Sequence, residues 1–406
     1  MSNRIPLIDL SRQTAGLMPA LGPAIRRLLR GSRFILGPEV ERFEGAWARF
    51  CRTRFAVGVA SGTDALELAL RAAGVGPGDR VATVSFTFVA TVDAILHVGA
   101  EPLWVDIDPA TCTMDPADLE RRLRALSPAA RRRVRAVIPV HLFGHPCDMT
   151  AIGRLARRYR LAVIEDAAQA AGARWRNRPV GGWGTAGCFS FFPSKNLGAF
   201  GDGGAIVTDS ARIDGVLRRI RIHGRDRQGR QSALGRNSRL DGLQAAILGV
   251  KLSRLSGWVA RRRKLAAGYR RRLSALPEIV CPVEQSGARH AYGLFVIRTP
   301  RRAALRSALQ AAGIGAQVYY DPPVHRQPLH RRRAAAVRLP ETDRAAREML
   351  ALPLYPEMTE GELRRICSVI RRFCSASRRP IRSGRKPARP AVSRAGGRRK
   401  RPGKGR

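Results

Sequence analysis

Hydrophobic and polar positions follow two recurring patterns along the first 240 residues. Short apolar runs, such as FAVGVA (55–60) and LAVI (161–164), are typical of buried strands. Between such runs lie segments with apolar residues every three or four positions, such as SGTDALELALRAAG (61–74), and these predict helices. Strands that alternate with helices predict an α/β fold, in which a mostly parallel sheet is sandwiched by helices.

The pattern changes near residue 240, where one nearly uninterrupted helical pattern begins. We expect a large α/β domain at 1–245, a connecting helix at 246–275 and a smaller C-terminal α+β domain at 276–373, which mixes short strands with helices. The last segment, 374–406, lacks aromatic and acidic residues beyond its start and is rich in Pro, Gly and Arg. Such a composition predicts a basic, disordered tail.

Composition narrows the class of protein. No apolar run approaches the roughly 18 residues that a membrane-spanning helix needs, and the N-terminal residues MSNRIPLIDL show no secretory signal. The seven cysteines are odd in number and form no CxxC pair, which favours a reducing cytoplasm over a disulfide framework.

The formal net charge is +43, and it comes almost entirely from arginine, with 68 arginines and six lysines. The arginines are spread through every segment rather than gathered in one stripe, which favours a compositional bias over nucleic-acid binding by the body of the chain. Fifteen basic residues and no acid lie in 371–406, so contact between the tail and anionic surfaces stays open.

Only three lysines precede residue 371, and one of them stands in the stretch FSFFPSKNLGAFGDGGA (189–205). Arginine stays charged and cannot act as a nucleophilic amine, whereas burial can free the lone pair of a lysine. Lys195 is therefore a candidate for a Schiff base with a carbonyl. The alternative is a surface lysine that the arginine bias has not replaced.

Two further features fall, like Lys195, at the carboxyl ends of predicted strands, where α/β sheets bind ligands. Pyridoxal phosphate would need backbone N–H groups for its phosphate, and Gly62-Thr63 at a helix start offers them. Its ring nitrogen would need a carboxylate, which Asp166 offers, while Glu165 should point the opposite way. Phe88 could stack on the ring. Each residue also has an ordinary structural explanation: Gly62-Thr63 could start a capped helix, Asp166 could start a loop, and Phe88 could lie in the core.

Long motifs in a characteristic order resemble the sugar aminotransferases of the DegT/DnrJ/EryC1/StrS family, which are fold-type I pyridoxal-phosphate enzymes. The resemblance covers roughly residues 4–370. It is carried by IPLIDL, LGPEVERFE, VASGTDALELAL, TFVAT, PVHLFG, VIEDAAQAAGA, FSFFPSKNLGAFGDGGA, NSRLDGLQAAIL, PPVHRQP and LPLYPEMT. Family members with histidine at the lysine position act as dehydratases, so Lys195 argues for transamination.

The resemblance implies a role for each matching residue. It assigns cofactor binding to Gly62, Thr63, Phe88, Asp166, Gln169, Ser190, Lys195 and Asn237. Lys195 would bind the cofactor covalently and move a proton, and Asp166 would hold the ring nitrogen. Gln169 would lie near the phenolic oxygen, while Gly62, Thr63 and Ser190 would hold the phosphate.

Other implied roles reach beyond the cofactor. Asn237 would contact the phosphate in a neighbouring subunit, which implies a homodimer with shared active sites. Tyr320 and His325 would contact a nucleotide sugar. No metal is expected, because His141 and His145 stand on a strand and turn, where their spacing does not let them share an ion.

The implied reaction is transfer of an amino group from glutamate to a keto nucleotide sugar for amino-sugar biosynthesis. The form KNLGAFGDGGA resembles members that aminate C3 of a 3-keto-6-deoxyhexose, with a 4-keto sugar or a 3-keto-uronate as alternatives. The loop before Asn237 lacks the tyrosine common in the family, which puts its substrate contacts in doubt. An alternative from another class is a catalytically silent nucleic-acid-binding or sensor protein on the same fold.

Overall fold

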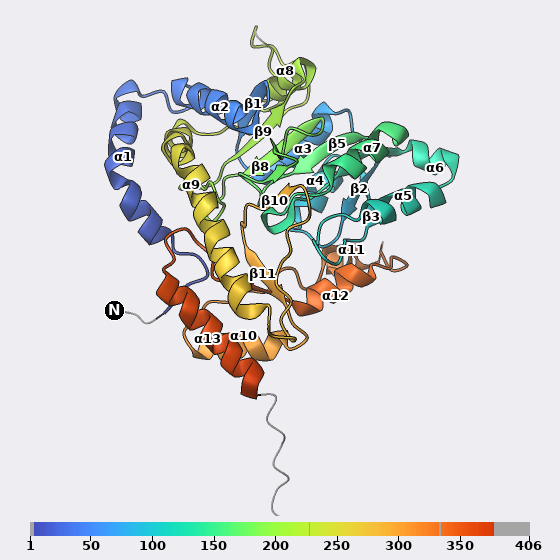
Figure 1. The fold of residues 1–406 in the computed structure, drawn as a ribbon. Coiled ribbons are helices and arrows are strands. Elements are labelled where there is room, and N and C mark those ends of the chain that lie inside the picture. Colours follow the sequence, from blue (N-terminus) through green and yellow to red (C-terminus); the bar gives the residue numbers. More distant parts are fainter. Residues whose placement is uncertain (1–3, 227, 333, 377–406) are drawn as a thin grey trace, which may run out of the picture.

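The computed structural model describes residues 4–226, 228–332 and 334–376 (Figure 1). A seven-stranded sheet has the order β1-β9-β8-β5-β4-β2-β3. Its strands are β1 (Phe55–Val59), β2 (Arg80–Val84), β3 (Glu101–Val105), β4 (Val134–Ile138), β5 (Ala162–Asp166), β8 (Ala186–Ser190) and β9 (Gly204–Thr208). β9 runs antiparallel to both neighbours, and the other strands run parallel to one another. The predicted α/β class is confirmed.

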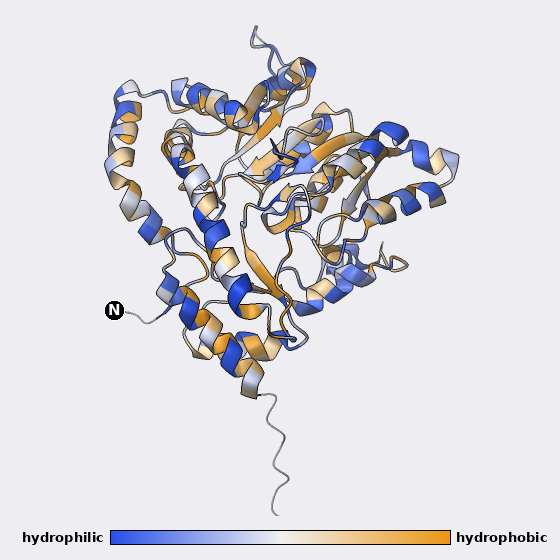
Figure 2. Cartoon of the chain, in the orientation of Figure 1, coloured by the Kyte–Doolittle hydropathy of each residue, from blue (hydrophilic) through white to orange (hydrophobic). Residues whose placement is uncertain are grey.

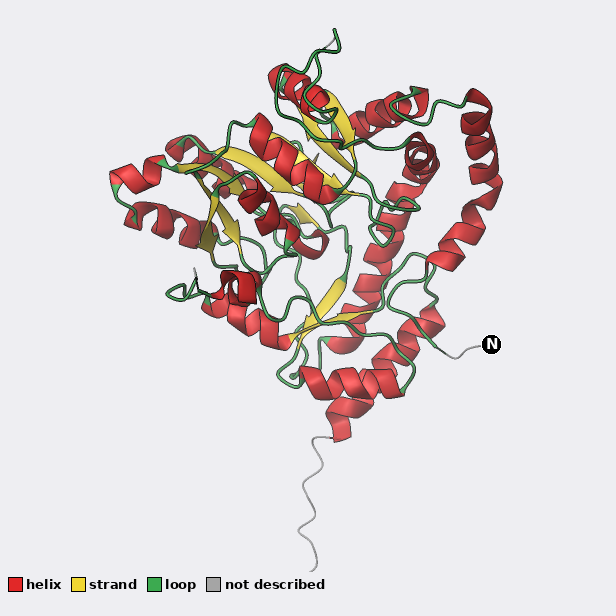
Figure 3. Cartoon of the chain, turned by 180° about the vertical axis from the view of Figure 1, so that it is seen from behind, coloured by secondary structure: helices red, strands yellow, loops and turns green. Residues whose placement is uncertain are grey.

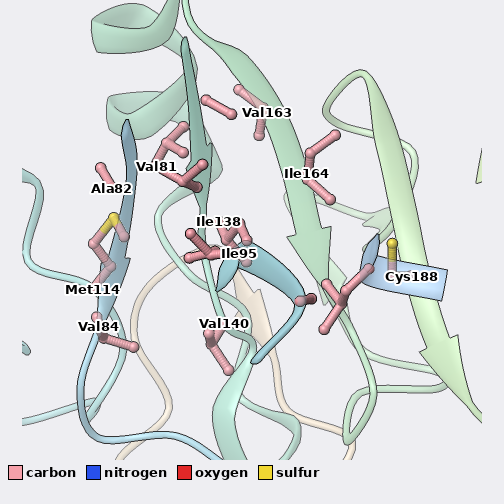
Figure 4. Close-up of a cluster of buried hydrophobic side chains, with 14 of the residues drawn as sticks. Val81, Ala82, Val84, Ile95, Met114, Ile138, Val140, Val163, Ile164 and Cys188 are labelled. Atoms are coloured by element: carbon pink, nitrogen blue, oxygen red, sulfur yellow. The ribbon is translucent and has the colours of Figure 1, made fainter. Parts of the chain in front are cut away.

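Helices cover both faces of this sheet (Figures 1 and 3). They are α2 (Pro38–Cys51), α3 (Gly62–Ala72), α4 (Ala90–His97), α5 (Pro116–Ala125), α6 (Pro128–Arg132), α7 (Met149–Tyr159) and α8 (Ala211–Ile220). The remaining helix of this half, α1 (Leu10–Gly31), packs on the long helix Gly242–Leu273 instead. Successive residues of β8 face opposite layers, since Cys188 packs in the core beneath α3 and Phe189 packs in the core beneath α2. The apolar strands that fill the centre stand out in Figure 2, and Figure 4 shows their buried side chains, including Val81, Ile138 and Ile164.

A second, smaller core lies below the sheet in Figure 1. The long helix α9 (Gly242–Leu273) packs against α2 at one end and α13 (Glu360–Ala376) at the other. A two-stranded sheet of β11 (Phe295–Arg298) and β12 (Met349–Leu352) joins α10 (Arg302–Ala311) in this core. The rings of Tyr269 and Phe295 stack there with centroids 4.6 Å apart.

The N-terminal segment belongs to this second core as well. Ile5 is 2% exposed among the residues of α9, α10 and α13, and its backbone bridges to Ile314. The sequence placed residues 1–245 together because local patterns do not reveal such a distant pairing. The expected connecting helix at 246–275 corresponds to α9 (Gly242–Leu273), which begins four residues earlier and ends two residues earlier.

Short elements complete the chain. They are β6 (Arg174–Trp175), β7 (Arg178–Pro179), β10 (Ala288–Arg289), α11 (Pro328–Arg331), α12 (Pro340–Glu348) and the 3-10 turns Leu142–Gly144 and Val324–Arg326. Among the described residues, none of the helices combines the length and the apolar character that crossing a membrane requires. Of the predicted tail, residues 374–376 complete α13, and 377–406 lie outside the described residues.

Candidate active site

A cavity of about 680 Å³ opens where several parallel strands end. The turn after β1, the segment between β2 and α4, the end of β5 and the turn after β8 all contribute to its wall. Residues 317–322, which follow α10, line it from the side of the second core. This is the edge at which an α/β sheet is expected to bind ligands. Eight of the ten predicted site residues line it: Gly62, Thr63, Phe88, Asp166, Gln169, Ser190, Lys195 and Tyr320.

The start of α3 lines this cavity and has the features that anion binding needs. Ser61 caps the helix by accepting a hydrogen bond from the N–H of Asp64 at 3.0 Å. The N–H groups of Gly62 and Thr63 belong to the first turn, which has no intrahelical acceptor for them, and the helix dipole adds positive potential. A Cβ on Gly62 would lie 2.7 Å from the Cβ of Ser190. Only glycine lets α3 sit this close to β8, and the arrangement fits a phosphate group.

Asp166 stands at the end of β5 with both carboxylate oxygens engaged. Its Oδ2 accepts a hydrogen bond from Thr91 Oγ1 at 2.8 Å, and its Oδ1 accepts one from the N–H of Ala168 at 3.1 Å. Burial raises the pKa of Asp166, and these two hydrogen bonds oppose the rise. A buried carboxylate of this kind fits a protonated ring nitrogen, whose charge would compensate its own.

Glu165, the preceding residue, does not line the cavity. Its carboxylate accepts hydrogen bonds from the N–H groups of Gly181 at 2.7 Å and Trp183 at 2.7 Å, and it bonds to His141 Nε2 at 3.0 Å. Strand alternation predicted this division between the two acids. His141 is therefore occupied by a structural contact, and the described residues contain no group of three or more His, Cys, Asp or Glu that could hold a metal.

Lys195 lies in the turn after β8 and lines the same cavity as Asp166. Burial lowers the pKa of Lys195, and the negative charge of Asp166 partly offsets this effect. Within the described part of the chain, its ammonium group has no hydrogen-bond or ion-pair partner. An unpartnered amine with a lowered pKa is suited to attack a carbonyl.

Gln169 and Tyr320 form one hydrogen-bonded unit at the cavity wall. The Oε1 of Gln169 accepts from the N–H of Phe143 at 2.8 Å, and its Nε2 donates to Tyr320 Oη at 2.8 Å. The second N–H of the amide is left to donate to a ligand oxygen, as the expected phenolic oxygen would require. Phe88 is 56% exposed in this single chain, and its ring centroid lies 6.3 Å from that of Tyr320.

Two predicted residues do not line the cavity. His325 is 3% exposed, and its Nδ1 lies 2.7 Å from Ser85 Oγ beyond the end of β2. His325 is therefore not among the residues that line this cavity, and its predicted contact with a nucleotide sugar stays a prediction. Asn237 is exposed and accepts a hydrogen bond from Arg239 Nε at 2.7 Å. Its predicted contact with a neighbouring subunit stays a prediction.

Comparison with known proteins gives a consistent result. The model of the DegT/DnrJ/EryC1/StrS aminotransferase family matches residues 20–371. The chain is 44% identical over 369 residues to a "pleiotropic regulatory protein" of Geobacillus stearothermophilus, covering 90% of this chain and 97% of that protein. It is 42% identical over 368 residues to the dTDP-3-amino-3,4,6-trideoxy-alpha-D-glucose transaminase of Streptomyces venezuelae, covering 90% and 95%.

The fold agrees with these matches. A crystal structure of DesV from S. venezuelae superposes with a TM-score of 0.88 at 42% identity, covering 92% of this chain and 99% of DesV. The cavity brings together groups that fit pyridoxal phosphate: the start of α3 for the phosphate, Asp166 for the ring nitrogen and Lys195 for the aldehyde. The chain belongs to the DegT/DnrJ/EryC1/StrS aminotransferase family and is a pyridoxal-phosphate-dependent sugar aminotransferase.

Proposed function

We propose that this enzyme transfers an amino group from glutamate to C3 of a 3-keto-6-deoxyhexose carried on a nucleotide. The proposal is supported by the name of the S. venezuelae relative, which specifies a 3-amino-3,4,6-trideoxyglucose on dTDP. The observation that carries it is the placement of Lys195, Asp166 and the start of α3 around one cavity.

The residues of this chain would divide the work as follows. The N–H groups of Gly62 and Thr63, with Ser190, would hold the phosphate, while Asp166 would hold the ring nitrogen. Pyridoxal phosphate, when bound, supplies the electron sink for the substrate carbon. The Nζ of Lys195 would remove the α-proton of glutamate and return a proton, and it would reverse these transfers for the sugar.

The cavity wall favours a subunit that completes its neighbour's site. Lys195 is the sole lysine or arginine among the described residues that line it, whereas Asp166, Asp202 and Asp321 are acidic. A nucleotide diphosphate and the carboxylates of glutamate need further cations. We infer that a second subunit supplies them in a homodimer, in which Asn237 reaches the phosphate of the partner's cofactor.

A panel of sugars tests the substrate. The purified protein is incubated with pyridoxal phosphate, glutamate and dTDP- or UDP-linked 3-keto and 4-keto hexoses, and the amino product is detected by mass. We expect the 3-keto-6-deoxyhexose to be converted fastest. Preferred conversion of a 4-keto sugar or of a 3-keto-uronate would replace this substrate with the corresponding alternative.

Two variants test the machinery in the same assay. Lys195→Ala should abolish turnover, whereas Lys264→Arg, which alters an exposed lysine in α9, should leave it unchanged. Asp166→Asn should bind cofactor but react far more slowly, because a neutral amide does not keep the ring nitrogen protonated. Near-normal turnover in either active-site variant would contradict the assigned role.

A regulatory protein on this fold is the second candidate, favoured by the name of the Geobacillus relative and by the charge of +43. Retention on DNA that falls steeply with salt, without any turnover of the panel, would support it. The intact cavity with an unpartnered Lys195 favours the enzyme.

A further inference from the structure

Two threonines form a hydrogen-bonded chain that ends on Asp166. Thr91, in the first turn of α4, is 1% exposed, and its Oγ1 lies 2.8 Å from Asp166 Oδ2. Thr87, four residues earlier, is also 1% exposed, and its Oγ1 lies 2.8 Å from Thr91 Oγ1. A hydroxyl has one hydrogen and an ionised carboxylate has none. Thr91 therefore donates to Asp166, and Thr87 donates to Thr91.

No other side chain in the described part of the chain donates a hydrogen bond to Asp166; the remaining donor is the backbone N–H of Ala168. His141 lies nearby but has no ring N–H to spare. Its Nδ1 accepts from the N–H of Cys147 at 3.0 Å, and its Nε2 bonds to Glu165 at 3.0 Å. Among the described residues, the two threonines are thus the side-chain hydrogen-bond donors to this carboxylate that a substitution can remove.

The hydrogen bond from Thr91 affects the charge state of Asp166. Burial favours the protonated form of Asp166, which would lack the negative charge that compensates a protonated ring nitrogen and would be a weaker acceptor for its N–H. A hydroxyl that donates to the carboxylate favours the ionised form, and a second hydroxyl behind it polarises the first. With Oδ2 bound to Thr91 and Oδ1 to Ala168, the plane of the carboxylate is also set.

We propose that Thr91, supported by Thr87, is a positioning residue that holds Asp166 in the orientation and charge state that bind the ring nitrogen of pyridoxal phosphate. The inference rests on the proposed role of Asp166. Thr91 is assigned no contact with the reacting atoms, and it acts through the carboxylate alone.

The test is the dissociation constant of pyridoxal phosphate, measured by fluorescence titration of the full-length apoprotein. Thr91→Val keeps the shape and removes the hydroxyl, so binding should weaken about tenfold, as expected for a lost hydrogen bond to a charged group. Thr91→Ser keeps the hydroxyl and should bind within about threefold of the native protein. Thr87→Val should weaken binding about threefold, because it acts only through Thr91.

A double-mutant cycle separates this role from a structural one. Asp166→Ala should weaken binding by itself, and adding Thr91→Val to it should change binding less than about twofold. Equal weakening by Thr91→Val in both backgrounds would overturn the inference, as would native binding by Thr91→Val when Asp166→Ala binds weakly. Native binding by Asp166→Ala would instead overturn the role of Asp166, and the inference with it. If Thr91→Val does not fold, native binding by Thr87→Val overturns the proposal.

Discussion

Lys195 and Asp166 are each held in an environment that disfavours their charge. Burial lowers the pKa of Lys195 and raises the pKa of Asp166, and each charge partly restores the other. Such opposed shifts within one cavity are typical of acid–base sites rather than of stabilising ion pairs. The arrangement favours the neutral form of the Lys195 amine, which covalent chemistry needs, and a cationic ring would favour the ionised form of Asp166.

The lowered pKa of Lys195 predicts how its reactivity depends on pH. Only the neutral amine is acylated, so the rate of labelling by acetic anhydride in the apoprotein should rise with pH and reach half its maximum below the ordinary lysine pKa of 10.5. Asp166→Asn removes the charge that raises this pKa, so the midpoint should move further down. Mass spectrometry of the peptide that carries Lys195 measures both, and an upward shift in the variant would contradict the electrostatic account.

At the scale of elements, the site depends on how closely α3 sits on β8 and β9. A Cβ on Gly62 would lie 2.7 Å from Ser190 Cβ, and one on Gly204 would lie 2.4 Å from the carbonyl oxygen of Ser61. These two contacts bring the first turn of α3 to the edge of the sheet beside Lys195. Glycine is required here by close approach and not by an unusual backbone conformation.

Gly62→Ala should therefore displace the start of α3 from β8. We expect pyridoxal phosphate to bind at least tenfold more weakly, and the free energy of unfolding to fall by about 1–3 kcal/mol, as for other overpacked contacts. Gly76→Ala is the control, because a Cβ there has no atom within 4 Å. Titration with cofactor and chemical denaturation check both variants, and unchanged cofactor affinity in Gly62→Ala would refute the proposed phosphate site.

At the scale of the molecule, residues from the sheet and from the side of the second core line one cavity, and part of its rim is exposed and apolar. Phe88 is 56% exposed and Phe192 is 51% exposed, and both line the cavity. Exposed aromatic rings grouped around a site favour coverage by another protein surface. Together with the shortage of cations in the cavity, they support the proposed homodimer.

Mixed subunits test whether the sites are shared. Lys195→Ala and Asn237→Ala should each be inactive or nearly so. In a mixed dimer, the Asn237→Ala subunit keeps its own Lys195 and would receive Asn237 from its partner, so one site in two should regain activity. Co-refolded subunits assayed for turnover should exceed the sum of the separate variants. If the mixture showed no gain over that sum, Asn237 would act within its own subunit.

The sequence predicts the central residues of the site, Lys195 and Asp166, from local motifs. Lys195 is predicted because it is one of three lysines before residue 371 in an arginine-rich chain, and Asp166 because it ends an apolar run. Both fall at the carboxyl ends of predicted strands, where α/β sheets bind ligands. The position of Thr91 on Asp166 was not predicted, although the spacing of Thr87 and Thr91 was visible in the sequence. The partner of the Thr91 hydroxyl depends on how α4 packs against β5. Thr91 and Asp166 are 75 residues apart in the sequence, so local patterns do not reveal this contact.

The sequence by itself determined the fold class, the order of the strands and helices, and the chemistry available at strand ends, because these follow from patterns within short segments. Only the tertiary structure decided that β9 runs antiparallel to its neighbours, that Ile5 joins the C-terminal core and that His325 is buried against Ser85. Each of these depends on contacts between distant parts of the chain. Such contacts produce no periodic pattern in the local sequence, so the sequence by itself does not predict them.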